Sequence, residues 1–219
     1  MLISLKLGKV VMLKNVIFLL LLLKMCFVFG QQKTIVIDPG HGGMDSGAIG
    51  VNGFKEKDVV LEVAKEIIRL NKTIFDGQLD IYLTRYRDTL VSLSDRAKLT
   101  KAINADVFVS LHCNHSVNPN TKGIEVYVYN RKNSFSRLSI WLGYGLQKGL
   151  SEKLGFKSRG VKFANFQVLR DAGEYSAVLV EMGFITHTSE ADYYLKSENI
   201  RAMALAILMG LCNYFNIGF

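Results

Sequence analysis

The sequence predicts an α/β fold, in which a mostly parallel central sheet of about six strands is covered by helices on both faces. One observation and one general rule carry this prediction. Short, apolar, β-branched runs such as Thr34–Ile37 and Val107–Leu111 alternate along the chain with longer amphipathic segments such as Lys57–Phe75. Strands that are separated by helices pair in parallel, and the helices then cover the sheet on both sides.

The strands are expected where β-branched and other apolar residues cluster. The run Val107–Leu111 is apolar apart from Ser110, as a strand that is buried on both faces would be. In chain order, the expected strands are Thr34–Ile37, Ile81–Thr84, Val107–Leu111, Ile124–Tyr129 and Ala177–Val180.

The helices are expected where apolar residues recur every three or four positions, because such residues share one face of a helix. Ser94 is expected to cap the second helix, since a serine hydroxyl can accept a hydrogen bond from the first helical turn. In chain order, the expected helices are Lys57–Phe75, Asp95–Asn104, Ser134–Leu154, Ser189–Leu195 and Asn199–Phe215.

Residues 1–30 differ in composition from the rest of the chain. Lysines precede the apolar run Val16–Leu23, and the small residue Gly30 follows it. This order is typical of a secretory signal peptide, and it predicts export to the periplasm or the cell exterior. The rival interpretation is an uncleaved anchor, but the apolar run is short and is interrupted by Lys24. Residues 31–219 then form one domain that keeps no stable membrane span.

The charge of the chain points away from nucleic acid as a partner. The formal net charge is +8, and residues 1–30 contribute four lysines and no acidic residue, which leaves 8 − 4 = +4 for the rest. A mild positive charge suits an anionic polymer such as cell-wall material. No dense stripe of arginine and lysine with interleaved aromatics occurs, so nucleic-acid binding is not expected. Outside the leader, Cys113 and Cys212 are too few for a disulfide framework.

Reactive side chains directly follow several of the expected strands. His41 follows the first strand in a glycine-rich loop, Arg85 follows the second, His112 the third, and Glu181 the last. The carboxyl ends of parallel strands meet at one edge of a sheet, where such folds bind ligands. Residues without a shared function would scatter over both edges and the helices. We therefore expect one site at this edge.

Two imidazoles and one carboxylate are a common set of ligands for a catalytic zinc ion. His41 and His112 supply the imidazoles, and Glu56, just before the first long helix, can bend back towards His41. Glu181 would stay off the metal and transfer a proton from a bound water to the leaving nitrogen. The spacing of these residues is weak evidence for a metal site, because no His-Glu-x-x-His or Cys-x-x-Cys motif is present. The alternative is that each histidine is simply a core or surface residue.

The segment Ile35-Val-Ile-Asp-Pro-Gly-His-Gly-Gly-Met-Asp-Ser-Gly-Ala-Ile-Gly50 closely resembles the opening motif of zinc-dependent N-acetylmuramoyl-L-alanine amidases of the bacterial cell-separation type. The resemblance covers residues 33–216 and includes Glu56–Asp58, Leu83–Arg85, Leu93–Arg96, Ala105–Asn114, Gly123–Tyr127, Arg159–Arg170 and Val178–Ile185. It implies that residues 31–219 are an amidase catalytic domain, with one zinc ion on His41, Glu56 and His112 and with Glu181 as the catalytic residue. The implied reaction cuts peptidoglycan between the lactyl group of muramic acid and L-alanine.

Further polar residues are expected to contact the substrate. Arg85 could bind a substrate carboxylate or form a structural ion pair, and the ion pair is favoured for Arg96. Asn114 could donate to the scissile carbonyl or cap its loop. Asn165 and Arg170 lie in a segment that resembles the substrate groove of the family, and Arg170 is expected to anchor a peptide carboxylate.

Asp38 and Asp45 flank His41, and either could accept a hydrogen bond from its imidazole or simply form a turn. Cys113 is expected to fill the core, because neighbouring side chains on a strand point to opposite faces. His115 is expected at the rim of the site or on the surface.

Some relatives carry an inserted helix that plugs the zinc site until a partner removes it. The interval Tyr129–Ser158 has room for one amphipathic helix, so no autoinhibitory helix and no activator are expected. Two other functions stay open: a zinc hydrolase of another amide or peptide, and a wall-binding module without catalytic activity.

Overall fold

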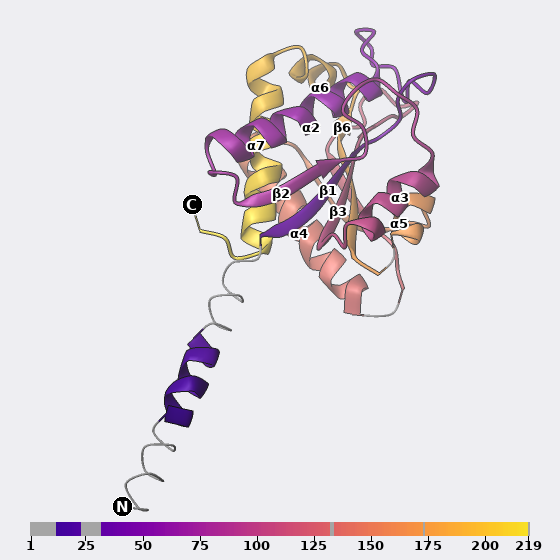
Figure 1. Cartoon of the computed structure of the whole chain (residues 1–219). Helices are drawn as coiled ribbons and strands as arrows, with labels where there is room; N and C mark the ends of the chain where they lie inside the picture. The colour runs from indigo at the N-terminus through magenta and orange to yellow at the C-terminus, as the bar shows by residue number, and fades with distance from the viewer. Residues whose placement is uncertain (1–11, 23–31, 132–133, 173, 219) are drawn as a thin grey trace, which may run out of the picture. The chain divides into compact units, whose positions relative to one another are not determined.

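The computed structural model describes residues 12–22, 32–131, 134–172 and 174–218. The chain divides into two units, Met1–Gln32 and Lys33–Phe219, and the second unit contains the sheet (Figure 1). The expected signal peptide lies largely outside the described residues. Only its residues 12–22 are described, and they are helical. Among the helices that are described, none has the length and apolar character needed to cross a membrane.

The second unit alternates strands and helices as the sequence predicts, except that the strand Ser158–Phe163 and the helix Gln167–Asp171 were not predicted. Its elements are β1 (Lys33–Pro39), α2 (Glu56–Thr73), β2 (Leu79–Leu83), α3 (Leu93–Ala102), β3 (Val107–Asn114), β4 (Ile124–Val128), α4 (Ser134–Leu154), β5 (Ser158–Phe163), α5 (Gln167–Asp171), β6 (Ser176–Phe184), α6 (Thr188–Tyr193) and α7 (Ser197–Tyr214).

The six-stranded sheet has the order β2-β1-β3-β6-β4-β5. All neighbouring strands are parallel except β4 and β6, which are antiparallel. The prediction of a mostly parallel sheet is therefore confirmed. The edge strand β5 lies in a segment where the sequence indicated no strand, because its residues Ser158–Phe163 do not form an apolar run.

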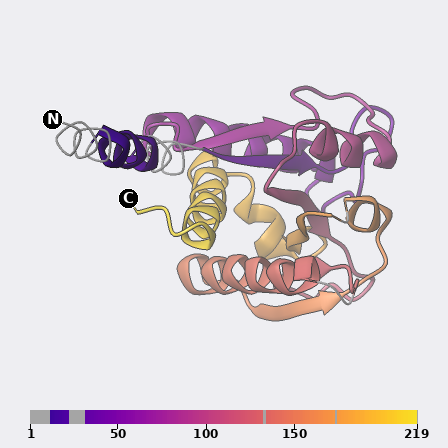
Figure 2. The ribbon, with the colours of Figure 1, turned by 60° about the horizontal axis from the view of Figure 1, so that its bottom comes forward.

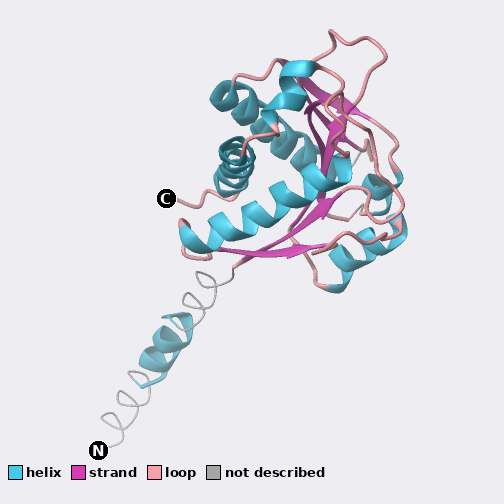
Figure 3. Cartoon of the chain, turned by 90° about the horizontal axis from the view of Figure 1, so that it is seen from above, coloured by secondary structure: helices cyan, strands magenta, loops and turns pink. Residues whose placement is uncertain are grey.

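Helices cover both faces of the sheet, as predicted (Figures 1 and 3). On one face α2, α4 and α7 pack their apolar stripes against alternate strand residues such as Val109, Val126 and Val180. On the other face α3 and α5 pack over Phe108 and Leu179. Since side chains alternate along a strand, Glu181 lies on the same face as Leu179 and therefore on the α3 and α5 side.

Helix α4 occupies the interval Tyr129–Ser158, in which the sequence predicts one amphipathic helix. It packs through Leu142, Leu146 and Leu150 against the core on the α2 and α7 side of the sheet. Figure 2 shows α4 beside the edge strand β5. This helix is therefore part of the core on the face opposite to Glu181.

One predicted helix start is wrong by a few residues. Helix α3 begins at Leu93, and its cap is Ser92, whose hydroxyl accepts a hydrogen bond from the Asp95 amide at 3.1 Å. Ser94 lies inside the helix. Both serines precede the same apolar pattern, so the pattern could not separate them.

Candidate metal centre

The loop after β1 brings His41 to the carboxyl edge of the sheet. The Gly40 amide donates to the Leu111 carbonyl at 3.0 Å, which holds this loop against β3. A Cβ atom on Gly40 would lie 2.4 Å from Cε1 of His112, so only glycine allows the loop to pass this imidazole. His41 itself adopts a φ of 59°, in the left-handed region that non-glycine residues rarely occupy. The surrounding contacts must therefore maintain this conformation.

Arg85 holds the same loop through hydrogen bonds to its backbone. Its side chain is 2% exposed, and its guanidinium donates to the carbonyls of Pro39 (2.9 Å), Gly40 (2.8 Å) and Lys57 (2.8 Å). The sequence suggested Arg85 as a substrate contact or as half of an ion pair. The structure instead commits this residue to backbone carbonyls, because a buried guanidinium needs acceptors for its donors.

Arg96 forms the structural ion pair that the sequence favoured. Its Nη1 donates to Asp38 Oδ1 at 2.6 Å, and both side chains are almost fully buried. Its Nη2 donates to the carbonyl oxygen of His41 at 2.7 Å. Arg96 therefore ties the His41 loop to Asp38 at the end of β1.

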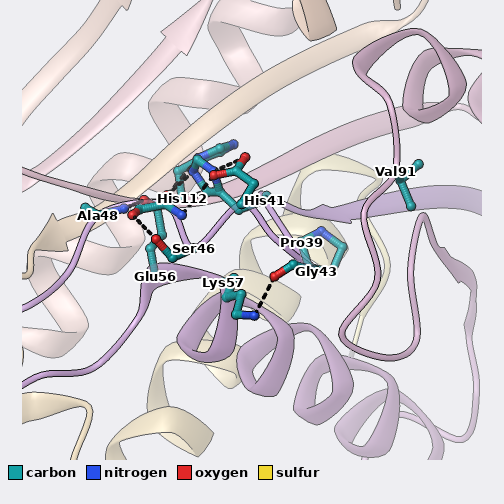
Figure 4. A network of polar contacts seen from close by, with 12 residues as sticks. Pro39, His41, Gly43, Ser46, Ala48, Glu56, Lys57, Val91 and His112 are labelled. Carbon is teal, nitrogen blue, oxygen red and sulfur yellow. Dashed lines mark hydrogen bonds and ion pairs between the residues drawn. The ribbon is translucent and has the colours of Figure 1, made fainter.

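Glu56 is the first residue of α2 and reaches both histidines (Figure 4). Its Oε1 lies 2.8 Å from Nδ1 of His112 and 3.0 Å from Nε2 of His41. The Cys113 amide also donates to Oε1 at 3.0 Å, and the Ala48 amide donates to Oε2 at 2.8 Å. Helix α2 and two backbone amides therefore fix the carboxylate between the two imidazoles.

These three residues form a candidate metal site. One ligand atom from each of His41, Glu56 and His112 lies within 4.8 Å of the other two. The two imidazole rings meet edge to face, with centroids 4.9 Å apart. The structure thus brings together the three residues that the sequence analysis selected as ligands.

His41 and Glu56 stabilise each other in their charged forms. Burial opposes the charged form of His41, but its hydrogen bonds to Glu56 and Asp45 outweigh burial and raise the pKa of His41 to about 9. Burial likewise opposes ionisation of Glu56, but hydrogen bonds from His112 and His41 keep the pKa of Glu56 well below its ordinary value. Without a metal, Glu56 is therefore a carboxylate that holds a proton on His41.

Asp45, rather than Asp38, orients the imidazole of His41. Its Oδ2 lies 2.8 Å from Nδ1 of His41, which leaves Nε2 facing Glu56. Asp38 is occupied by Arg96, Thr84 and Ser110. The sequence left both aspartates open because both flank His41.

Glu181 lies next to this site, in one row of residues across three strands. It pairs in register with His112 on β3 and with Glu125 on β4. Its Oε2 is buried and has no hydrogen-bond partner among the described residues. Burial raises the pKa of Glu181 to about 7. A carboxyl group with a free oxygen and a pKa near neutrality can accept and release a proton.

A cavity of about 620 Å³ opens beside the two histidines. His41 and His112 line one side, and the other side is formed by the loop 90–93 and by Val168 of α5. Two of the three ligand residues, His41 and His112, thus border a space that can hold a substrate.

The other residues that were predicted to contact the substrate lie outside the three-residue cluster. Asn114 accepts a hydrogen bond from the His115 amide at 2.8 Å, and its Nδ2 donates to Glu125 at 3.0 Å. It therefore caps its own loop while it faces Glu125. Asn165 and Arg170 bind one another at 2.9 Å on the exposed side of α5.

The two described cysteines are buried and free, so they do not pair with one another. Burial raises the pKa of the Cys113 thiol, which favours the neutral form. The prediction that Cys113 fills the core is confirmed, and His115 is exposed.

No role was predicted from the sequence for Glu125, Arg159 and Lys162, although the structure pairs Glu125 with Glu181 and places both cations on Glu125. Glu125 is buried, and it binds both cations directly. The motifs Gly123–Tyr127 and Arg159–Arg170 contained these residues, but their contact depends on a strand pairing that the pattern did not reveal.

A protein family described as N-acetylmuramoyl-L-alanine amidase matches residues 35–213. The chain belongs to the N-acetylmuramoyl-L-alanine amidase family. The catalytic domain of the amidase CwlV from Bacillus (Paenibacillus) polymyxa is 30% identical, with a TM-score of 0.77, and the match covers 85% of this chain and 100% of that one. An amidase from Clostridium difficile is 33% identical, also with a TM-score of 0.77, over 84% of this chain and 97% of that one.

Among curated proteins, the amidase LytC of Bacillus subtilis is 38% identical over 187 residues. That match covers 84% of this chain but only 36% of LytC. The amidase AmiA of Escherichia coli is 29% identical, over 85% of this chain and 78% of AmiA. The amidase fold and the predicted α/β class thus agree.

Proposed function

We propose that this amidase hydrolyses peptidoglycan between the lactyl group of N-acetylmuramic acid and L-alanine, using one zinc ion on His41, Glu56 and His112. The observation that carries the proposal is the cluster of three ligand atoms within 4.8 Å, next to a Glu181 oxygen that has no described partner. Two imidazole nitrogens and one carboxylate oxygen match the donor set of catalytic zinc sites. The residues present therefore fit this ion.

When bound, zinc would supply a Lewis acid for the scissile carbonyl and would lower the pKa of a bound water to about 7. Asp45 holds Nδ1 of His41 and so keeps Nε2 directed at the ligand cluster. Glu181 accepts the proton of the attacking water and donates it to the leaving nitrogen. The C–N bond breaks, and the products are a free lactyl carboxylate and the amino group of L-alanine.

The test combines metal analysis with identification of products. Glu181→Gln should retain zinc but lose about 10²- to 10⁴-fold in activity, because the variant cannot accept the proton. Glu152→Gln, on the exposed side of α4, is the matched control for loss of one carboxylate. Mass analysis of digested sacculi should show free lactyl ends. Products that retain the lactyl amide would contradict the proposal and indicate cleavage of another bond.

We also propose that Asn165 and Arg170 contact the peptide from the exposed side of α5. Arg170 keeps a side-chain exposure of 42%, so its guanidinium remains accessible. Arg170→Ala should raise KM with little effect on kcat, since the residue would bind the substrate equally before and during the reaction. An unchanged KM would contradict the proposal that Arg170 contacts the substrate.

The proposal includes export, with residues 1–30 as a cleaved signal peptide. Peptidoglycan lies outside the cytoplasm, and the order of lysines, apolar run and glycine at the N-terminus supports secretion. Sequencing of the N-terminus of exported protein should find a start near Gln31. A mature protein that still begins at Met1 or Met12 would contradict cleavage.

No activator is expected for this domain. Helix α4 packs in the core on the face opposite to Glu181. Purified residues 31–219 should therefore digest peptidoglycan alone, and activity that appears only after a partner is added would contradict this expectation.

A further inference from the structure

A bulge in the edge strand β5 directs two cations to the same face of the sheet. The register between β4 and β5 shifts, so that Ile124–Val126 lies opposite the longer segment Ser158–Val161. In a regular strand, residues three positions apart point to opposite faces, but one extra residue returns Arg159 and Lys162 to the same face. Gly160, between them, has a φ of 82°, a backbone conformation that favours glycine.

Both cations bind the buried carboxylate of Glu125. Arg159 Nε lies 2.5 Å and Lys162 Nζ 2.7 Å from Glu125 Oε1. Asn114 and Tyr127 donate to the other oxygen, at 3.0 Å and 2.6 Å. Burial opposes ionisation, but these hydrogen bonds lower the pKa of Glu125 to about 2. One carboxylate thus binds two cations, whose combined charge exceeds its own.

The two cations remain accessible while their carboxylate is covered. The side chains of Arg159 and Lys162 are 29% and 40% exposed, against 4% for Glu125. Arg159 also lies over the ring of Phe184, 5.2 Å from its centroid, which fixes the guanidinium. A guanidinium carries five N–H donors and an ammonium three, so both groups keep donors for another anion after Glu125 has been satisfied.

The position of the cations relative to Glu181 decides which anion they can meet. Glu125 pairs directly with Glu181, and such pairs lie about 5 Å apart. The cations therefore lie roughly one strand spacing beyond Glu181, on the side away from His112. An extended peptide advances about 3.3 Å per residue, so this place corresponds to one or two residues beyond the scissile amide.

We infer that Arg159 and Lys162 form an anion subsite that binds a carboxylate of the stem peptide next to L-alanine. The inference rests on the proposed function. The sugar side of the scissile bond carries no anion, because the lactyl carboxyl group is bound in the amide, so the positive charge selects the peptide side. Glu125 is a positioning residue, which holds both cations over the substrate path.

The test compares two substrates that differ in one charge. Disaccharide-linked L-alanyl-D-glutamate and L-alanyl-D-isoglutamine are the same size, but the second has an amide in place of the α-carboxylate. The wild-type protein should cleave the first with a kcat/KM about tenfold higher, the effect of one charge-assisted hydrogen bond. Lys162→Met should lose most of this preference while it retains activity on the amide.

Two further variants complete the experiment. Lys162→Arg keeps the charge and should retain the preference, and Lys157→Met removes an exposed lysine just before β5 and should behave as the wild-type protein. A thermal melt of each variant confirms folding. Equal losses on both substrates in Lys162→Met, or no preference in the wild-type protein, would overturn the subsite but leave the proposed function intact. A wild-type protein that cleaves neither substrate would overturn the proposed function and the subsite together.

Discussion

The raised pKa of Glu181 predicts a specific effect on the stability of the metal-free protein. The pKa lies at about 7 in the folded protein, compared with 4.5 for an ordinary glutamate side chain. Because folding favours the neutral carboxyl group, the folded state binds more protons than the unfolded state between these two values. The free energy of unfolding therefore falls as the pH rises from about 4.5 through 7. Glu181→Gln removes this loss, since an amide does not ionise.

The magnitude follows from the size of the shift. A shift of about 2.5 units at 1.36 kcal/mol per unit corresponds to about 3 kcal/mol. The variant should thus gain about 3 kcal/mol over the wild-type protein at pH 8 compared with their difference near pH 4.5. Denaturant unfolding of chelator-treated protein at both pH values measures this quantity, and Glu152→Gln is the control. A difference between variant and wild-type protein that does not change with pH would refute the reasoning.

Three further predictions concern the residues that build the metal centre. Asp45→Asn should weaken metal binding about 10- to 100-fold, because the imidazole of His41 loses the carboxylate that orients it; competition with a chromophoric chelator measures this, and unchanged affinity would contradict it. Arg85→Met should lower the free energy of unfolding by roughly 2–4 kcal/mol and leave KM unchanged, because three buried carbonyls lose their hydrogen-bond donor. A raised KM with normal stability would instead indicate that Arg85 contacts the substrate. Gly40→Ala should abolish metal binding, because the alanine methyl group would overlap the ring of His112. A variant that still binds one metal ion would show that the loop can move to make room for the methyl group.

The clustering of the candidate site residues could be predicted because it depends on a rule of parallel sheets. His41, His112 and Glu181 each follow an apolar run of a strand, and these runs point to one edge of the sheet. Glu56 was harder to predict, because its position depends on how the loop 40–55 folds back. Its place before the first long helix suggested it as a ligand, and the family resemblance implied the same assignment.

The contacts that the sequence did not reveal depend on packing between distant segments. The meeting of Glu125 with Arg159 and Lys162 requires the β4–β5 pairing and a bulge at Gly160, and neither leaves an apolar pattern. Arg85 follows a strand just as His41 does, but its direction is set by the carbonyls around it, which only the folded chain brings together.

The sharing of one Glu56 oxygen by two imidazoles has a consequence for how the ion is acquired. The cluster already holds its shape with a proton in place, so loading the ion is a competition with protons rather than a rearrangement of the chain. Since the proton on His41 leaves only near pH 9, the apparent affinity for zinc should rise about tenfold per pH unit below that value. At acidic pH the protons of this cluster would then outcompete the ion, and a rise in pH would favour its return.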